Sequence, residues 1–272
     1  MPYRTERVLY CSGVSHTVGF IGVGAIAAAI ATAILDRPEP AAAEVLLSPR
    51  SAARSEALAA QFSQARVMPD NQAVVDGSDI VMIAVLPSQV AEICSALRFR
   101  PDQIVVGVAA GWPPAQLRPL VAPATTVGQL IPLPMITLGL GPVVLYPTIP
   151  EVESLLAGCG TLVVLEREEQ VGVLSAGSAI MSSFFAFQNA AIDWIASHGF
   201  DRALAAEYVT SQLHGLASES IGMDLAELAD AVEEHETPGG LNEQVRLTLT
   251  DTGMFAALTA ELEKLYQDRV RS

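Results

Sequence analysis

The residues with the clearest chemical meaning are small ones near the N-terminus. Residues 22–27 read Gly-Val-Gly-Ala-Ile-Ala, which fits the pattern G-x-G-x-x-A at the junction of a predicted strand and helix. Gly22 permits the tight turn, and Gly24 lets a pyrophosphate approach the backbone. The amide groups of Ala25 and Ile26 would face the phosphates, assisted by the helix dipole. The pattern therefore predicts a dinucleotide site, although close packing of a small-residue helix is an alternative reading.

The end of the second predicted strand favours NADP over NAD. Ser48, Arg50 and Ser51 follow the apolar run 44–47, and Arg54 lies one helical turn further on. An NAD site usually places Asp or Glu here to bind the ribose hydroxyls, whereas Arg and Ser suit a 2′-phosphate. Solvated surface arginines remain the alternative, although a basic cluster is unusual in a chain of net charge −15.

Two later strand ends complete the predicted cofactor crevice. Ligands of doubly wound folds bind outside the carboxyl ends of the strands, and two further segments leave the sheet at that edge. Contacts to the ribose and the nicotinamide are therefore expected from Ala84, Val85, Leu86, Pro87, Ala110 and Gly111, with Ser88 beside them. A turn that needs Pro or Gly only for its shape is an equally good explanation of each segment.

The elements that position these residues alternate along the first part of the chain. From Thr17 onward, short apolar runs alternate with Ala-rich helical patterns, which is typical of a parallel sheet covered by helices. After about Arg167 the strand patterns stop and long helical patterns follow. We therefore expect an α/β fold, with an N-terminal Rossmann doubly wound sheet over 1–166 and a C-terminal all-helical substrate and dimerisation domain over 167–272. Residues 1–16 read as an extension of the first domain.

The bounds of the individual elements follow from the same patterns. Strands are predicted at 18–21, 44–47, 66–68, 80–85, 104–108, 125–130, 143–146 and 162–165. Helices of the first domain are predicted at 25–35, 52–64, 71–76, 89–97, 114–121 and 151–157. Helices of the second domain are predicted at 168–197, 201–220, 224–234, 240–251 and 253–269.

Composition argues against several classes of partner. The chain carries 30 acidic and 15 basic residues, so it would repel a nucleic acid backbone. Its three cysteines form no C-x-x-C pair, which argues against a thiolate metal site and favours a reducing, cytoplasmic compartment. Apolar stretches at 18–35, 127–147 and 171–192 have the length of membrane spans. The first contains the glycine pattern, the second contains prolines, and the third is rich in Ser, so we expect a helix buried by protein and no membrane.

Several segments together resemble pyrroline-5-carboxylate reductase: Gly19–Gly24, Ala84–Gln89, Val106–Gly111 and Thr237–Gly240. Their order and spacing match over about residues 17–270, and Thr-Pro-Gly-Gly late in the helical domain is the most specific element. The resemblance implies hydride transfer from NADPH to the carbon of a C=N bond in a small cyclic imine. It also implies a homodimer formed through the C-terminal helices, with the substrate between the nicotinamide and the partner's helical domain.

The chain departs from that family at several positions of the expected pocket. The Met-Pro-Asn-Thr-Pro segment of the family is here Ile131–Pro134, without the Asn, and Leu86 stands where a Lys is usual. The two threonines that commonly follow Gly240 are replaced by Leu241 and Asn242. A pocket that has exchanged polar groups for apolar ones suits a different imine, or one with a larger apolar body.

Candidate chemistry in the helical domain centres on Thr237. Because the cofactor carries the hydride, the protein needs to supply only orientation and a proton. Thr237 precedes Pro238 at a predicted helix start, an arrangement that would offer a substrate carboxylate the amides of the next residues. We assign substrate binding to Gly239, Gly240, Leu241 and Asn242. Simple N-capping of the helix, and solvation of Asn242, are the alternatives.

Two further candidates come from the family resemblance. Ser178 lies near the family's Ser-Gly-Ser segment, and Gln212 falls where a family threonine is expected, so both join Thr237 as catalytic candidates. His214 and His235 are further residues that could supply a proton. A lone histidine on a helix is nevertheless more often packed or solvated.

Other functions remain open beside the imine reductase. One is a reductase of similar build that uses NADP or F420 on another substrate, and the other is a non-catalytic nucleotide-binding dimer whose pocket has decayed. Retention of Thr237–Gly240 argues against decay. The predicted long helix argues for a dimer, because it carries more large apolar side chains than a solvent-facing helix would: Phe184, Phe185, Phe187, Ile192, Trp194 and Ile195.

Overall fold

The computed structural model describes residues 16–109 and 111–270, which form two compact units. The N-terminal unit ends at Gly172 and the helical unit begins at Val173, inside helix α7 (Glu169–Gly177). This division falls a few residues after the boundary expected at 166. The predicted extension lies outside the described residues except for His16, as does the cofactor candidate Ala110.

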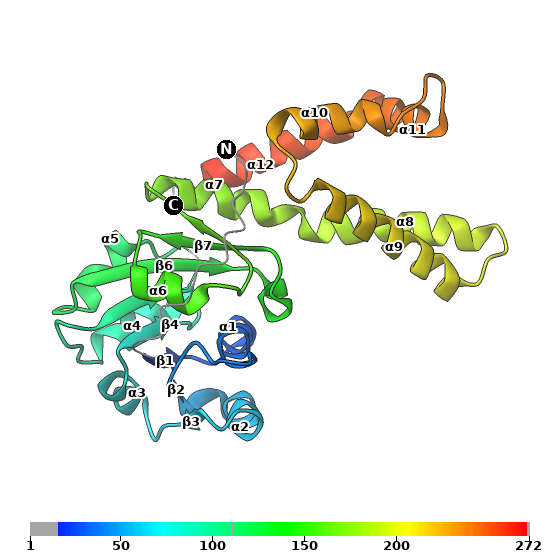
Figure 1. The fold of residues 1–272 in the computed structure, drawn as a ribbon. Helices are drawn as coiled ribbons and strands as arrows, with labels where there is room; N and C mark the ends of the chain where they lie inside the picture. The colour runs from blue at the N-terminus through cyan, green and yellow to red at the C-terminus, as the bar shows by residue number, and fades with distance from the viewer. Residues whose placement is uncertain (1–15, 110, 271–272) are drawn as a thin grey trace. The chain divides into compact units, whose positions relative to one another are not determined.

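An eight-stranded sheet forms the centre of the N-terminal unit, in the order β3-β2-β1-β4-β5-β6-β7-β8. The first six strands pair in parallel, which is the doubly wound arrangement expected from the alternating pattern (Figure 1). The strands are β1 (Thr17–Ile21), β2 (Glu44–Leu47), β3 (Ala65–Val67), β4 (Ile80–Ile83), β5 (Ile104–Gly107), β6 (Thr126–Pro132), β7 (Pro142–Tyr146) and β8 (Thr161–Val164).

The sheet reverses direction at β7. The strand β7 is antiparallel to β6, and β8 is parallel to β7, so the parallel pairing expected from the alternating pattern ends at β6. The cause is the connection between β6 and β7, which contains only the short 3-10 helix η4 (Pro134–Leu138). A parallel crossover needs about a dozen residues or more, whereas the next connection carries helix α6 (Pro150–Leu156) and restores parallel pairing.

Helices cover both faces of the sheet, which explains its apolar strands. Along β2, Val45 and Leu47 belong to one buried cluster and Leu46 to the other. The first cluster includes side chains of α1 (Ala25–Leu35), α2 (Ala52–Gln61) and α6, and the second those of α3 (Asn71–Gly77), α4 (Val90–Ser95) and α5 (Pro114–Leu117). Figure 1 shows α1 and α2 on one side of the strands and α3 and α4 on the other. Strands buried on both faces read as continuous apolar runs.

The helical unit continues α7 with α8 (Met181–Ser197), α9 (Arg202–Ser220), α10 (Leu225–Glu234), α11 (Leu241–Asp251) and α12 (Met254–Val270). The single helix expected over 168–197 is interrupted by the 3-10 turn η5 (Ser178–Ile180). Asp201 and Asp224 accept hydrogen bonds from first-turn amides, and these caps set the starts of α9 and α10. The buried residues Ile192, Ala205 and Val209 join α8 to α9.

The long apolar segment is not buried by its own chain. Glu169–Ser197 is long and apolar enough to cross a membrane, and only 11% of its most apolar window is buried among the described residues. Phe185 is 57% exposed and Trp194 is 65% exposed. The expectation that protein buries this helix therefore depends on the predicted partner chain.

Candidate functional site

The predicted cofactor crevice lies where the ends of β1 and β4 meet. These neighbouring strands pair as far as Ile21 and Ile83, and the helices that follow them pack on opposite faces of the sheet. Ligands of doubly wound folds bind at such a switch point. We use the term cofactor crevice for the residues that follow β1, β2, β4 and β5, namely 22–26, 48–51, 84–89 and 111–112.

Gly22 and Gly24 play different parts in the turn after β1. Gly22 has a φ of +89°, and a Cβ there would lie 2.8 Å from the Ala84 carbonyl oxygen, so the turn needs glycine. Gly24 begins α1 in an extended conformation with a φ of −77°. Among the described residues nothing lies within 4 Å of a Cβ at Gly24, and no side chain caps the helix. The first-turn amides of Ala25 and Ile26 therefore remain available to an anion.

Ser48 is part of the scaffold of this turn. Its hydroxyl accepts from the Gly22 amide at 2.9 Å, and its carbonyl accepts from the Ser55 hydroxyl at 2.8 Å. The residue is only 1% exposed. Of the predicted phosphate contacts, Ser48 thus has its side chain directed at the glycine turn, whereas Ser51 is half-buried and Arg50 is exposed.

Arg50 is hydrogen-bonded to Gln89, a residue that the sequence pattern did not indicate as a site residue. Gln89 ends the 3-10 turn η2 (Pro87–Gln89). The side-chain amide of Gln89 is oriented so that both its oxygen and its nitrogen are satisfied. In this orientation the oxygen accepts from Arg50 Nη1 at 3.2 Å and from Nη2 at 3.1 Å. This contact orients the Arg50 guanidinium near the crevice while leaving it exposed. Nothing in the sequence pattern joins positions 50 and 89, because the contact depends on the strand order.

Trp112 joins the segments that follow β4 and β5 by a hydrogen bond. Its indole Nε1 donates to the Pro87 carbonyl oxygen at 2.8 Å, so the segment after β5 supports the segment after β4. Gly111 has a φ of +76°, a conformation that favours glycine at this position. The Leu86 side chain is 66% exposed. The bond fixes the shape of residues 84–87, where we expect the ribose and nicotinamide.

Gln129 is a further polar residue that the sequence analysis missed. It lies on β6 opposite Gly107 and is 3% exposed. Its Oε1 has no hydrogen-bond partner among the described residues. The only available signal was a glutamine between apolar residues of a predicted strand. A buried, unpartnered oxygen of this kind is a candidate for a contact that a ligand or water completes.

The Thr-Pro-Gly-Gly turn between α10 and α11 is bonded within itself. The Gly240 amide donates to the Thr237 carbonyl oxygen at 2.7 Å, and the Gly239 amide donates to Glu243 Oε2 at 2.5 Å. The turn and the glutamate at the third helical position thus already bond the two amides that the sequence pattern assigns to a substrate carboxylate. The amides of Leu241 and Asn242 remain, since no side chain in the described chain caps α11.

The neighbouring side chains reinforce this turn. Asn242 Nδ2 donates to the His235 carbonyl oxygen, and Gln244 Nε2 donates to the Gly239 carbonyl oxygen, both at 2.7 Å. The His235 ring lies 3.3 Å from Glu219 Oε2. Its hydrogen bond to the Ala231 carbonyl, followed by the charge of Glu219, raises the pKa of His235. Asn242 thus holds the turn with its amide nitrogen, and His235 is engaged by a carboxylate.

The other catalytic candidates stand apart in the helical unit. Ser178 lies in η5 and donates to the Ser175 carbonyl oxygen at 2.8 Å, as a local helix contact would. Gln212 is exposed on α9, and Thr237 is exposed in the turn before α11. No hydrogen bond joins these three residues within the described chain. His214 is also exposed on α9.

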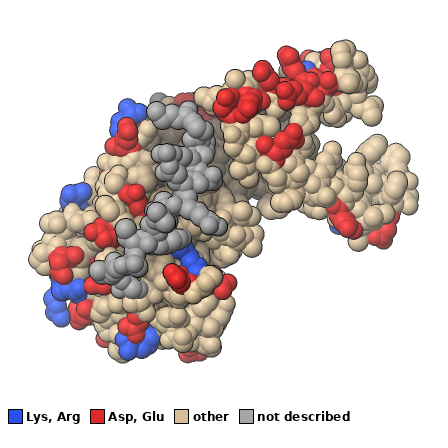
Figure 2. All heavy atoms as spheres, viewed as in Figure 1, with Lys and Arg blue, Asp and Glu red and all other residues tan. Residues whose placement is uncertain are grey.

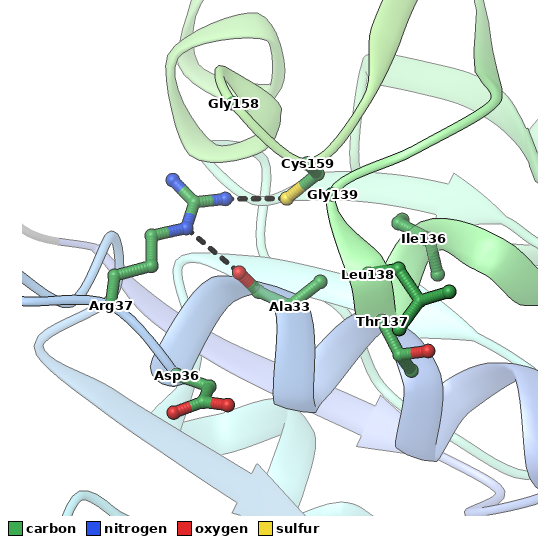
Figure 3. A pocket seen from close by; sticks show the side chains of 9 residues that line it. All are labelled: Ala33, Asp36, Arg37, Ile136, Thr137, Leu138, Gly139, Gly158 and Cys159. Atoms are coloured by element: carbon green, nitrogen blue, oxygen red, sulfur yellow. Dashed lines mark hydrogen bonds between the residues drawn. The ribbon is translucent and has the colours of Figure 1, made fainter. Parts of the chain in front are cut away.

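A cavity lies beside the end of α1, and none of the cofactor-crevice residues lines it. It holds about 280 Å³ and is lined by residues 33, 36, 37, 136–139, 158 and 159. Figure 3 shows the Arg37 guanidinium directed at the Cys159 sulfur and at the Ala33 carbonyl oxygen. A third bond joins Arg37 Nη1 to the Ala157 carbonyl oxygen at 2.7 Å. Because these bonds occupy every nitrogen of the guanidinium, Arg37 fastens α1 to residues 157–159, and the cavity is not the candidate site.

Comparison with known proteins gives consistent results over nearly the whole chain. Residues 17–111 match the family described as "NADP oxidoreductase coenzyme F420-dependent". A pyrroline-5-carboxylate reductase of Vibrio alginolyticus is 26% identical over 269 residues, which cover 92% of this chain and 98% of the relative.

Solved structures share the fold. A pyrroline-5-carboxylate reductase of Coxiella burnetii has a TM-score of 0.81 at 17% identity, and the match covers 95% of this chain and 98% of that one. A reductive aminase of Aspergillus terreus, solved with NADPH and ethyl levulinate, has a TM-score of 0.56 at 19% identity, with 95% and 94% covered. The chain thus has a sequence relationship to one kind of enzyme and shares its fold with a second.

Proposed function

We propose that this chain, a distant full-length homologue of the pyrroline-5-carboxylate reductases, reduces the C=N bond of a small cyclic imine with NADPH. The open start of α1 at Gly24 carries the proposal, because it leaves first-turn amides beside a glycine turn at the switch point of the sheet. Ser51 and Arg50 suit the 2′-phosphate, and residues 84–87 with 110–111 suit the ribose and nicotinamide. When bound, the nicotinamide supplies the hydride.

The helical unit would complete the reaction. Thr237 and the turn at 239–242 bind the substrate, while Ser178 and Gln212 are further candidates to orient it or move a proton. The exposed apolar face of α8 supports a homodimer in which each chain's helices complete the partner's site. The absence of paired cysteine motifs from the sequence supports a cytoplasmic location.

Turnover is the direct test. The purified protein would be mixed with NADPH and either pyrroline-5-carboxylate or other cyclic imines, and NADPH loss would be followed by absorbance, with NADH in parallel. Turnover of any imine with NADPH is the expected result. Tight NADPH binding without turnover would favour a non-catalytic nucleotide-binding dimer or another substrate, and failure to bind either nucleotide would favour an F420-linked enzyme.

Arg50 gives a specific prediction about cofactor choice. Arg50→Gln should weaken NADPH binding roughly tenfold and leave NADH binding unchanged, because a charge-assisted bond to the 2′-phosphate is lost at an exposed position. Both affinities would be measured by fluorescence titration. Arg118→Gln removes the same charge from an exposed position outside the cofactor crevice and is the matched control. Equal losses for the two nucleotides would mean that Arg50 does not recognise the 2′-phosphate.

A further inference from the structure

We infer that Glu243 selects against a carboxylate on the substrate, so that the proposed imine carries none and binds as a protonated iminium. The inference rests on the proposed function, which places the substrate at the turn before α11. The hydrogen bonds and charges of this turn indicate the chemical class of the substrate.

The glutamate already stands where an anionic substrate group would be held. Its Oε2 accepts from the Gly239 amide at 2.5 Å, one of the amides that the sequence pattern assigned to a substrate carboxylate. A carboxylate bound instead to the Leu241 and Asn242 amides would lie within one helical turn of Glu243. Like charges at such a distance repel by enough to weaken binding about fivefold in water, and more where solvent is excluded.

Among the described residues, the surroundings of the turn offer a substrate carboxylate no free cation. Arg246 makes a two-pronged contact with Glu236, with Nη2 and Oε2 2.9 Å apart, and His235 faces Glu219. Glu233 and Glu234 lie on the end of α10 beside them. Figure 2 shows acidic side chains gathered over the part of the helical unit that carries α10. The local field of the described residues therefore favours a positive ligand over a negative one.

An iminium fits both the charge and the chemistry. The hydride of NADPH forms the new C–H bond, the electron pair of the C=N bond moves to nitrogen, and the products are an amine and NADP⁺. The reaction needs no further reductant. Leu241 is 81% exposed at the start of α11, where the family has a threonine, and it would contact the apolar body of such a substrate. Glu243 acts on binding, and the cofactor performs the reduction.

The unmodified protein tests the inference directly. It would be assayed with NADPH and either 1-pyrroline or pyrroline-5-carboxylate, which share a ring and differ by the carboxylate. We expect kcat/KM to be roughly tenfold or more higher for 1-pyrroline, as the charge argument requires. A preference for pyrroline-5-carboxylate would overturn the inference while supporting the proposed reductase. Failure to reduce either compound or any other imine would reject the proposed function and this inference with it.

A charge-neutral variant isolates the glutamate. Glu243→Gln keeps an oxygen that can accept from the Gly239 amide, and it should shift the ratio of the two kcat/KM values roughly tenfold toward pyrroline-5-carboxylate, mainly through KM. Glu151→Gln removes one charge from an exposed position on α6 of the N-terminal unit and should leave the ratio unchanged. An unchanged ratio in Glu243→Gln, with the same thermal unfolding as the parent, would overturn the role of Glu243.

Discussion

Gly24→Ala should raise the Kd for NADPH by a factor of at least about 100 while leaving the folded protein about as stable as the parent. The added methyl group meets nothing within 4 Å in the described chain, and the φ of −77° suits alanine. Alanine is a poorer N-cap than glycine but restricts the unfolded chain, and these opposing effects are each about 0.5–1 kcal/mol. The methyl would occupy the space through which the pyrophosphate approaches the backbone.

Gly22→Ala is the matched comparison, because its effect should be on folding. At a φ of +89°, and with a Cβ 2.8 Å from the Ala84 carbonyl oxygen, alanine should lower the free energy of unfolding by about 2–4 kcal/mol. Thermal unfolding and NADPH titration of both variants separate the two effects. Normal NADPH affinity in Gly24→Ala would reject the dinucleotide site at α1.

Gln103→Leu should cost about 2–4 kcal/mol of stability, which lowers the unfolding temperature by roughly 5–10 °C. Gln103 is fully buried before β5, and its Oε1 accepts from the Arg100 amide at 2.8 Å. Its Nε2 donates to the carbonyl oxygens of Val75 at 2.6 Å and Ser78 at 2.9 Å. Leucine fills the space but leaves the partly buried Arg100 amide without this acceptor.

Gln72 supplies the control for that substitution. It makes comparable contacts with both backbone groups of Arg98, each at 3.0 Å, but in an exposed position. Gln72→Leu should therefore cost less than about 1 kcal/mol, because water can replace the lost bonds. Thermal unfolding of the two variants measures the difference. Equal losses would show that burial of Gln103 is not the cause. NADPH affinity should be unchanged in both variants at temperatures where they are folded.

The sequence predicted those features that depend on local patterns. The bounds of α1 and β2 are as expected, because a glycine turn and a run of apolar residues mark them. The doubly wound sheet, the helical unit and the relationship to pyrroline-5-carboxylate reductases are confirmed. The family resemblance rested on short segments whose backbone conformation requires particular residues, such as the turn at Gly22.

Features that depend on distant contacts were not predicted. The reversal of β7 depends on the length of a connection, and the break at Ser178 depends on how one helix bends. The burial of Ser48 depends on an amide 26 positions away, and the contact between Arg50 and Gln89 on strands that are not consecutive. At the turn before α11, the motif was visible, but the bond from the Gly239 amide to Glu243 was not. The residue roles, the dimer and the compartment remain predictions.

The hydrogen bond between Gly22 and Ser48 has a consequence for how such a protein can evolve. It joins the turn that we expect to approach the phosphates to the strand end that we expect to distinguish the riboses, so a substitution of Ser48 also affects the turn. Effects of mutations at residues in contact are not additive. Because position 22 needs glycine, a lineage that changes its nucleotide through position 48 must keep there a side chain that accepts from the Gly22 amide, or change other residues of the turn as well.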